Sequence, residues 1–247
     1  MMDKDLAARV FACIDNTTLG TTDTVASVEK FCRKTRSMNM TVAGVCVYPR
    51  FVPVAAEVLK GSGIRVVSVA SDFPHGQADI AIKLEDVKAL VSAGADEVDI
   101  VINRGLVLEG RYDEAVDEIR RQHELMQGRT LKVIIETCDL GDKQLIETAS
   151  QIAIDGGADF IKTSTGKGSG GATLEAAEVM LNCIKANVKK GKKTVGFKAA
   201  GGIRKPEEAM QYAEMAMQIM GAEYIVPQTF RIGASSLTES VYSLLTK

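Results

Sequence analysis

The stretch GADEVDI at residues 94–100 recurs as GADFIK at 157–162 and, in a degraded form, as GAEYIV at 221–226. The first glycines of the three copies stand 63 and then 64 residues apart. Self-similarity at a nearly constant interval is typical of a repeated structural unit. We therefore expect one architectural unit to recur along the chain, with each of these copies opening a strand.

Short runs of β-branched residues alternate with helical patterns on both sides of these copies. Between the runs, apolar residues follow helical spacing, as in Leu174, Leu181 and Ile184. This alternation predicts parallel strands, and eight strand–helix units in 247 residues predict a closed barrel rather than an open sheet. The expected fold is a single (β/α)8 TIM barrel domain over residues 1–247. The expected strands lie at 12–19, 41–49, 64–73, 95–103, 131–140, 158–166, 194–202 and 222–230.

The composition excludes several classes of protein. Hydrophobic residues make up 46% of the chain and charged residues 25%, which is ordinary globular composition and argues against a disordered chain. The net charge of −2 argues against a protein that binds nucleic acid through its phosphates. No apolar run approaches the ~18 residues of a membrane span. The acidic N-terminal segment is not typical of a signal peptide.

Cysteine and histidine usage restricts the chemistry. The five cysteines are scattered without a CxxC pair, which argues against a disulfide scaffold and against a zinc site. This pattern favours a reducing, cytoplasmic location. Only two histidines, His75 and His123, are present, which excludes a multi-histidine metal centre. Cys46 is expected to fill space in the barrel, because no histidine is placed to activate it. Catalysis would depend on Lys, Asp, Glu, Cys or backbone groups, and we expect no metal or other cofactor.

Two lysines stand inside apolar strands, just before glycine-rich loops. Lys162 lies in FIKTS, and Lys198 lies in GFKAAGG on the next expected strand. A single strand lysine would most simply extend its amine to solvent. Two on neighbouring strands favour a Schiff-base lysine whose pKa is lowered by a cationic neighbour.

Simple electrostatics supports this pairing. Lowering a lysine pKa from about 10.4 to about 7 requires roughly 4.6 kcal/mol of preference for the neutral amine. A second ammonium ~6 Å away supplies about 2.8 kcal/mol at an effective dielectric near 20. Partial desolvation would supply the rest, provided that Lys198 stays charged.

Two aspartates are candidate partners of these lysines. Asp99 and Lys162 each lie five residues after their repeat glycine, on even-numbered strands, so they are expected in one layer near the C-terminal mouth of the barrel. This placement favours a proton-transfer role for Asp99 over a purely structural one. Asp15, on the first strand, could support Lys198, although Asp before Asn-Thr-Thr is also typical of a turn.

Glycine-rich loops follow three of the expected strands and suggest a phosphate site. The loop at 163–177 lacks the spacing of a Walker motif, while the loops after strands seven and eight contain GGIR (201–204) and GASS (233–236). In such barrels these two loops and a helix N-terminus commonly bind phosphate. Ser236 and Glu239 predict a capping box at that helix, and Lys167 or Arg204 would add positive charge.

Taken together, six motifs resemble the deoxyribose-phosphate aldolase family. They are VCVYPRF (45–51), SDFPHG (71–76), EVDIVIN (97–103), FIKTSTGK (160–167), VGFKAAGGIR (195–204) and RIGASS (231–236). The resemblance runs in order from IDNTTL at 14–19 to the last helix, so it covers nearly the whole chain.

The resemblance implies a metal-independent class I aldolase on a (β/α)8 barrel. Such an enzyme reversibly cleaves 2-deoxy-D-ribose 5-phosphate to D-glyceraldehyde 3-phosphate and acetaldehyde. Carried over by motif, Lys162 matches the Schiff-base lysine, Lys198 the second lysine and Asp99 the acid/base aspartate. The implied phosphate contacts are Gly166, Lys167, Gly201, Gly202, Gly233, Ser235 and Ser236.

Two alternatives stay open. One is another lysine-dependent sugar-phosphate aldolase or transaldolase, and the other is a non-catalytic sugar-phosphate-binding barrel. In each case the expected partners are small molecules, which for the enzyme are a sugar phosphate and aldehydes. Binding to nucleic acid or to a membrane is not expected. The family resemblance also implies a role in deoxyribonucleotide catabolism in the cytoplasm. Members of this family are often homodimers, so a homodimer is one expected assembly.

Overall fold

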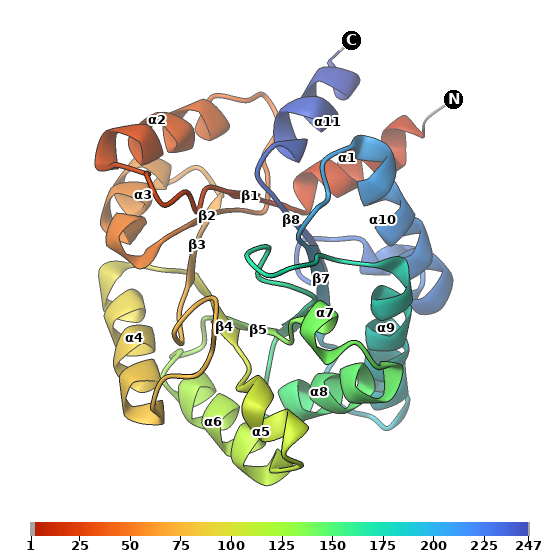
Figure 1. Cartoon of the computed structure of the whole chain (residues 1–247). Coiled ribbons are helices and arrows are strands. Elements are labelled where there is room, and N and C mark those ends of the chain that lie inside the picture. The colour runs from red at the N-terminus through yellow and green to blue at the C-terminus, as the bar shows by residue number, and fades with distance from the viewer. Residues whose placement is uncertain (1–2, 247) are drawn as a thin grey trace.

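The computed structural model describes residues 3–246 and contains a closed barrel of eight parallel strands in sequence order, surrounded by helices (Figure 1). This confirms the predicted (β/α)8 barrel. The strands are β1 (Ile14–Thr17), β2 (Gly44–Val47), β3 (Arg65–Val69), β4 (Glu97–Val101), β5 (Thr130–Ile134), β6 (Phe160–Lys162), β7 (Gly196–Ala200) and β8 (Phe230–Ala234).

The helices form the outer ring of Figure 1. They are α1 (Lys4–Ala12), α2 (Val25–Arg36), α3 (Val52–Leu59), α4 (Ile80–Ala93), α5 (Arg104–Leu108), α6 (Tyr112–Glu124), α7 (Thr137–Leu140), α8 (Lys143–Asp155), α9 (Leu174–Lys189), α10 (Pro206–Met220) and α11 (Leu237–Leu245), with 3-10 turns η1 (Pro49–Phe51) and η2 (Ala222–Tyr224). No helix within residues 3–246 is long and apolar enough to cross a membrane.

Several helices begin at side chains that accept backbone hydrogen bonds. Thr24 and Ser27 form a reciprocal capping box at the start of α2, and Asp79, Asp142 and Thr173 cap α4, α8 and α9. Each such oxygen satisfies a backbone N–H that has no acceptor within its helix. These caps fix where each helix starts after the loop that follows its strand.

The strands are buried on both faces, but the two faces differ in chemistry. On β4, Val98 and Ile100 belong to the large apolar core. Glu97 and Asp99 alternate with them, so they point to the opposite face, the barrel interior. A small apolar cluster of Leu19, Cys46, Val67 and Val69 fills the side of the interior near β1 to β3. The rest of the interior is therefore available to charged side chains.

The predicted eighth strand at 222–230 is wrong. Residues Ala222–Tyr224 form η2, and β8 runs over Phe230–Ala234. Pro227 interrupts the run, and proline cannot donate a hydrogen bond to a strand ladder. The Tyr224 hydroxyl instead donates to the backbone oxygen of Val195 at 2.7 Å. The third repeat copy thus opens a turn, so only the first two copies open strands.

Candidate active site

Seven charged side chains meet inside the barrel, and we call them the barrel charge cluster. Three are carboxylates and four are cations, and every side chain is at most 5% exposed. They come from six of the eight strands. The members are Asp15, Glu97, Asp99, Lys132, Lys162, Lys198 and Arg231.

The strand register explains why Lys162 and Lys198 are neighbours. The two residues are direct partners across β6 and β7, so their side chains point to the same face of the sheet. Their amines both donate to Oδ2 of Asp99, each at 2.8 Å. Lys198 also donates to Oδ2 of Asp15 on β1. The structure therefore brings together all four of the residues for which sequence predicted catalytic or supporting roles.

Burial and neighbouring charges shift the pKa values of Lys162 and Lys198 in opposite directions. Burial has the largest effect on Lys162 and lowers its pKa; Asp99 opposes this shift, and Lys198 adds to it. Burial also disfavours the ammonium of Lys198, but Asp15 and Asp99 outweigh it and raise the pKa of Lys198. Sequence predicts that the second ammonium is the main cause of the lowered pKa of Lys162, whereas in the structure the main cause is desolvation. Lys198 stays charged, as that prediction requires.

Asp99 is held as a carboxylate. Burial disfavours its ionised form, but Lys132, Lys162 and Lys198 outweigh this effect and lower its pKa well below the usual range. Lys132 donates to Oδ1 at 2.8 Å, so both oxygens of Asp99 accept hydrogen bonds from ammonium groups. A carboxylate that contacts two other amines and the buried Lys162 is suited to moving protons beside that amine.

Sequence reasoning missed three members of the cluster, namely Glu97, Lys132 and Arg231. Lys132 is the direct strand partner of Asp99, and Arg231 is the direct partner of Lys198. Each lies within an otherwise largely apolar buried strand, and Glu97 stands two residues before Asp99 on the same face. The available signal was a charged residue inside each of these strands, and in β4 the two-residue spacing of Glu97 and Asp99, which puts both on one face.

A cavity of about 490 Å³ opens at the C-terminal ends of β1, β6, β7 and β8. Lys162 is the member of the charge cluster that lines it, so the lysine with the lowered pKa faces the open space. The proposed phosphate residues that line the cavity are Gly166, Lys167, Gly201, Gly202, Gly233 and Ser235. These side chains and loops therefore surround one cavity, as the sequence predicted.

Ser236 does not line the cavity and does not form the predicted capping box. It is exposed, it is not among the cavity-lining residues, and it is the N-cap of α11 without a side-chain cap hydrogen bond. Glu239 pairs instead with Lys34 of α2. The predicted capping box is therefore wrong, because the glutamate finds a cation on a neighbouring helix rather than the backbone of its own first turn.

Two glycine-rich loops pack directly on each other at the cavity. The Ala172 amide donates to the backbone oxygen of Gly201 at 3.1 Å. A Cβ at Gly171 would lie 2.3 Å from that same oxygen, and Gly201 has a φ of 90°. Glycine is therefore required by close approach at Gly171 and by backbone conformation at Gly201.

Glu136 anchors the loop that follows Lys162. It is buried, and its Oε2 accepts hydrogen bonds from the backbone and the hydroxyl of Thr165. On the other side of that loop, Lys167 donates to the backbone oxygen of Leu19 at 2.6 Å. The loop is thus tied to β5 and to the chain after β1, although nothing in the sequence singled out Glu136.

Cys46 is buried in the barrel as expected, and His75 lies in an exposed loop. Cys46 is buried in the barrel, and burial raises the pKa of its thiol to about 11. His75 is exposed in the loop after β3, where its backbone oxygen accepts from Arg104. Within residues 3–246, no group of three or more His, Cys, Asp or Glu side chains is arranged to hold a metal ion.

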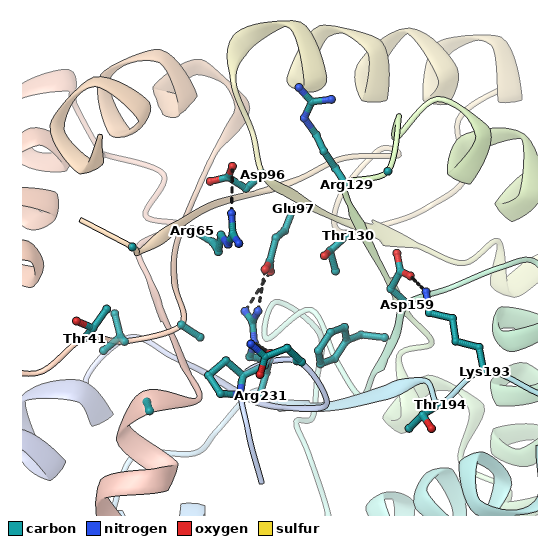
Figure 2. Close-up of a pocket in the computed structure, with 18 residues that line it drawn as sticks. Thr41, Arg65, Asp96, Glu97, Arg129, Thr130, Asp159, Lys193, Thr194 and Arg231 are labelled. Carbon is teal, nitrogen blue, oxygen red and sulfur yellow. Dashed lines mark hydrogen bonds and ion pairs between the residues drawn. The ribbon is translucent and has the colours of Figure 1, made fainter. Parts of the chain in front are cut away.

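A second cavity, of about 760 Å³, lies at the opposite, N-terminal end of the barrel. Figure 2 shows Glu97 and Arg231 facing each other within it, with the pairs Arg65–Asp96 and Lys193–Asp159 nearer its rim. The barrel charge cluster therefore extends from one cavity to the other, with Lys162 at one end and the Glu97–Arg231 pair at the other.

Comparisons with known proteins agree with this geometry. The sequence model of DeoC/LacD family aldolases matches residues 9–241. The aldolase QR15 is 30% identical, with 96% of each chain covered and a TM-score of 0.79. A provisionally assigned deoxyribose-phosphate aldolase from Coccidioides immitis is 28% identical, with 96% of this chain and 86% of that chain covered and a TM-score of 0.83.

A third solved structure has a defined assembly. The deoxyribose phosphate aldolase of Aeropyrum pernix, which is tetrameric, is 26% identical, with 99% of this chain and 92% of that chain covered and a TM-score of 0.75. A family match over most of the chain and the closed barrel lead to one conclusion: this protein is an aldolase and belongs to the DeoC/LacD family.

Proposed function

We propose that the chain is a deoxyribose-phosphate aldolase that reversibly cleaves 2-deoxy-D-ribose 5-phosphate through a Schiff base on Lys162. The observation that carries this proposal is the position of Lys162, which lines the 490 Å³ cavity while its amine lies 2.8 Å from Asp99. Its lowered pKa makes the neutral, nucleophilic amine available at lower pH than for an ordinary lysine.

The first half of the reaction builds the imine. The neutral amine of Lys162 attacks C1 of the ring-opened sugar and forms a carbinolamine. Loss of the hydroxyl as water then gives the protonated imine, and this loss requires a proton donor. Lys198 is charged and Asp99 joins the two amines, so this pair can deliver the proton and take it back.

The second half breaks the carbon–carbon bond. The C3 hydroxyl loses its proton, the C2–C3 bond breaks, and its electron pair moves into the protonated imine. D-glyceraldehyde 3-phosphate leaves, and an enamine stays on Lys162. Protonation of the enamine at C2, followed by hydrolysis of the imine, releases acetaldehyde and restores the amine. The imine acts as the electron sink, so the mechanism assigns no step to a metal.

The glycine-rich loops would hold the phosphate of the substrate. Lys167 and Ser235 line the cavity together with backbone of the loops after β6, β7 and β8. A lysine, a hydroxyl and exposed backbone suit a phosphate dianion. Lys162 and these loops share one cavity, as a substrate with an aldehyde at one end and a phosphate at the other requires.

Borohydride reduction in the presence of acetaldehyde tests this proposal. A two-carbon adduct should form and map by mass spectrometry to Lys162, and the Lys162→Leu variant should give none at any pH. An adduct on another residue, or an active enzyme that gives no adduct, would contradict the proposal. Activity should also survive EDTA. Use of acetaldehyde as the donor distinguishes this activity from that of a transaldolase, which needs a hydroxylated donor.

The proposed activity belongs in the breakdown of deoxyribonucleosides, and we place it in the cytoplasm. We further propose that residues 1–247 act as one barrel domain and that the functional assembly is a homodimer. Light scattering of the purified protein tests the assembly, with the tetramer of the Aeropyrum pernix relative as the competing result.

A further inference from the structure

We propose that Arg231 is a positioning residue that keeps Lys162 neutral from the far end of the barrel, by completing the positive charge of the barrel charge cluster. Arg231 lines the N-terminal cavity, on the opposite side of the barrel from the cavity that Lys162 lines. It would act without touching substrate. The inference rests on the Schiff-base function proposed for Lys162.

Arg231 is built firmly into the cluster. Its NH1 donates to Oδ1 of Asp15 at 2.6 Å, and its NH2 donates to Oε1 of Glu97 at 2.7 Å. NH1 also donates to Oε2 of Glu97 at 3.0 Å, so this contact is bidentate. The guanidinium additionally lies over the ring of Phe160, 5.4 Å from its centroid. A planar, permanently charged group fits these contacts better than an ammonium would.

Two continuous chains of contacts connect Arg231 to Lys162. One passes from Asp15 to Lys198 and on to Asp99. The other passes from Glu97 to Lys132, which donates to Asp99 at 2.8 Å. Both end at Asp99, which accepts from Lys162 at 2.8 Å. The side chains along both chains are at most 5% exposed, so solvent screens their charges little.

The charge count identifies what Arg231 contributes. Three carboxylates face four cations, so the cluster is electrically balanced when one cation gives up its proton. Balance matters because an uncompensated charge in a dry interior is costly. Lys162 is the cation that can lose its proton, since it borders a cavity and contacts one carboxylate, whereas Lys132 and Lys198 each contact two or more.

Two further cations, Lys167 and Arg204, line the same cavity as Lys162, but both are exposed, so solvent screens their charges and the buried groups set this balance. Asp99 from β4 contacts Lys162, and Lys198 from β7 and Cys46 from β2 act on it electrostatically. Lys132 from β5 contacts Asp99, and Asp15 from β1 contacts Lys198. Cys46 stays a neutral thiol, because burial raises its pKa to about 11. Without Arg231, three carboxylates would face only Lys132 and Lys198, and a proton on Lys162 would restore neutrality.

Arg231→Met tests the inference through the pH dependence of imine formation. The readout is the rate at which borohydride traps the acetaldehyde adduct, measured as a function of pH. The acidic limb of this profile, where the rate rises with pH, should move upward by roughly one pH unit, the effect of a charge on the order of 10 Å away at an effective dielectric near 20. The rate at pH 7 should fall about tenfold and recover at alkaline pH. Arg231→Lys, which keeps the charge, should leave the limb near its wild-type position.

A double variant and a chemical rescue make the test specific to charge. Arg231→Met with Glu97→Gln removes one charge of each sign, so the limb should return towards wild type although the contacts are lost. In Arg231→Ala, added guanidinium can enter through the 760 Å³ cavity and should shift the limb back downward. Urea, a neutral molecule of the same shape and at the same low concentration, should not.

The outcomes separate this inference from the proposed function. If the wild type gives no adduct on Lys162, the proposed function fails. If the wild type gives the adduct but Arg231→Met keeps the wild-type limb, Arg231 does not control the charge of Lys162 and this inference alone is overturned. A limb that shifts equally in Arg231→Met and in the double variant also overturns it, since packing rather than charge is then responsible.

Discussion

Lys162 and Lys198 are direct strand partners and donate to the same oxygen of Asp99, yet burial and charge move their pKa values in opposite directions. The difference comes from one additional carboxylate, because Asp15 accepts from Lys198 and not from Lys162. Lys162 also lines the cavity, whereas Lys198 does not. The geometry thus favours Lys162 as the nucleophile and Lys198 as its charged partner.

Lys198→Leu should strongly reduce turnover at pH 7 and recover part of it as the pH rises towards 9–10. Removing an ammonium ~6 Å away eliminates about 2.8 kcal/mol of repulsion, so the pKa of Lys162 should rise by about two units. The Lys162 amine would then be mostly protonated at neutral pH. A pH–rate profile measures the shift, and borohydride trapping should still label Lys162.

Lys198→Arg is the matched control for charge. It should keep the acidic limb near its wild-type position, because the cation is retained. If Lys198→Leu is equally inactive at every pH, Lys198 acts chiefly as a proton donor, and the electrostatic account is wrong.

Asp99→Asn should lower kcat by at least about 10²-fold and destabilise the fold by roughly 3 kcal/mol. The amide cannot shuttle protons, and it leaves buried ammonium groups without their shared carboxylate. The folded-state pKa of Asp99 is lowered, so its ionisation stabilises the fold above the unfolded value of about 3.9 and this contribution is lost as the pH falls below it. Urea unfolding of both proteins at pH 7 and pH 3 checks this: the difference between them should shrink by roughly 1 kcal/mol at the lower pH.

Ser235→Asp should raise KM for deoxyribose 5-phosphate far more than KM for free deoxyribose. A carboxylate placed in the cavity repels the phosphate dianion, whereas the unphosphorylated sugar loses nothing there. Ser236→Asp is the neighbouring control, because Ser236 is exposed and does not line the cavity. A larger effect at Ser236, or equal effects on both sugars, would place the phosphate elsewhere.

Gly171→Ala should raise KM for the phosphorylated substrate and lower the Tm by several degrees. Its new Cβ would lie 2.3 Å from the Gly201 oxygen, so the two glycine-rich loops must separate. Gly168→Ala tests the same loop without this clash, because its nearest neighbour is 3.7 Å away. Gly168→Ala should behave like wild type. Equal effects of both substitutions would show that loop flexibility, not close packing, is what the glycines provide.

The sequence predicted the barrel and the site at the resolution that periodicity allows. Alternation of strand and helix patterns is a local signal, and it located most strands correctly. The equal spacing of Asp99 and Lys162 from their repeat glycines correctly predicted that they meet. The same repeat led to the wrong position for β8. The similarity of GAEYIV to the other copies predicts a strand there, although a proline directly after GAEYIV interrupts the run.

What the sequence did not reveal depends on closure of the barrel. Glu97, Lys132 and Arg231 matter because the barrel brings strands from distant parts of the chain around one interior. Glu136 became recognisable only when its contacts with Thr165 were visible. A loop contact of this kind has no periodic signature in sequence.

In the proposed mechanism, the seam where β1 pairs with β8 also determines when Lys162 becomes reactive. Asp15 is 183 residues from Lys198 and 216 residues from Arg231 in sequence, so the charge cluster is complete only after the last strand has closed the barrel. Before closure Lys162 is an ordinary solvated lysine with a pKa near 10.4, protonated and inert towards aldehydes. On the proposed mechanism, folding is the step that makes Lys162 reactive, and an incomplete or damaged chain is expected to react with aldehydes only slowly.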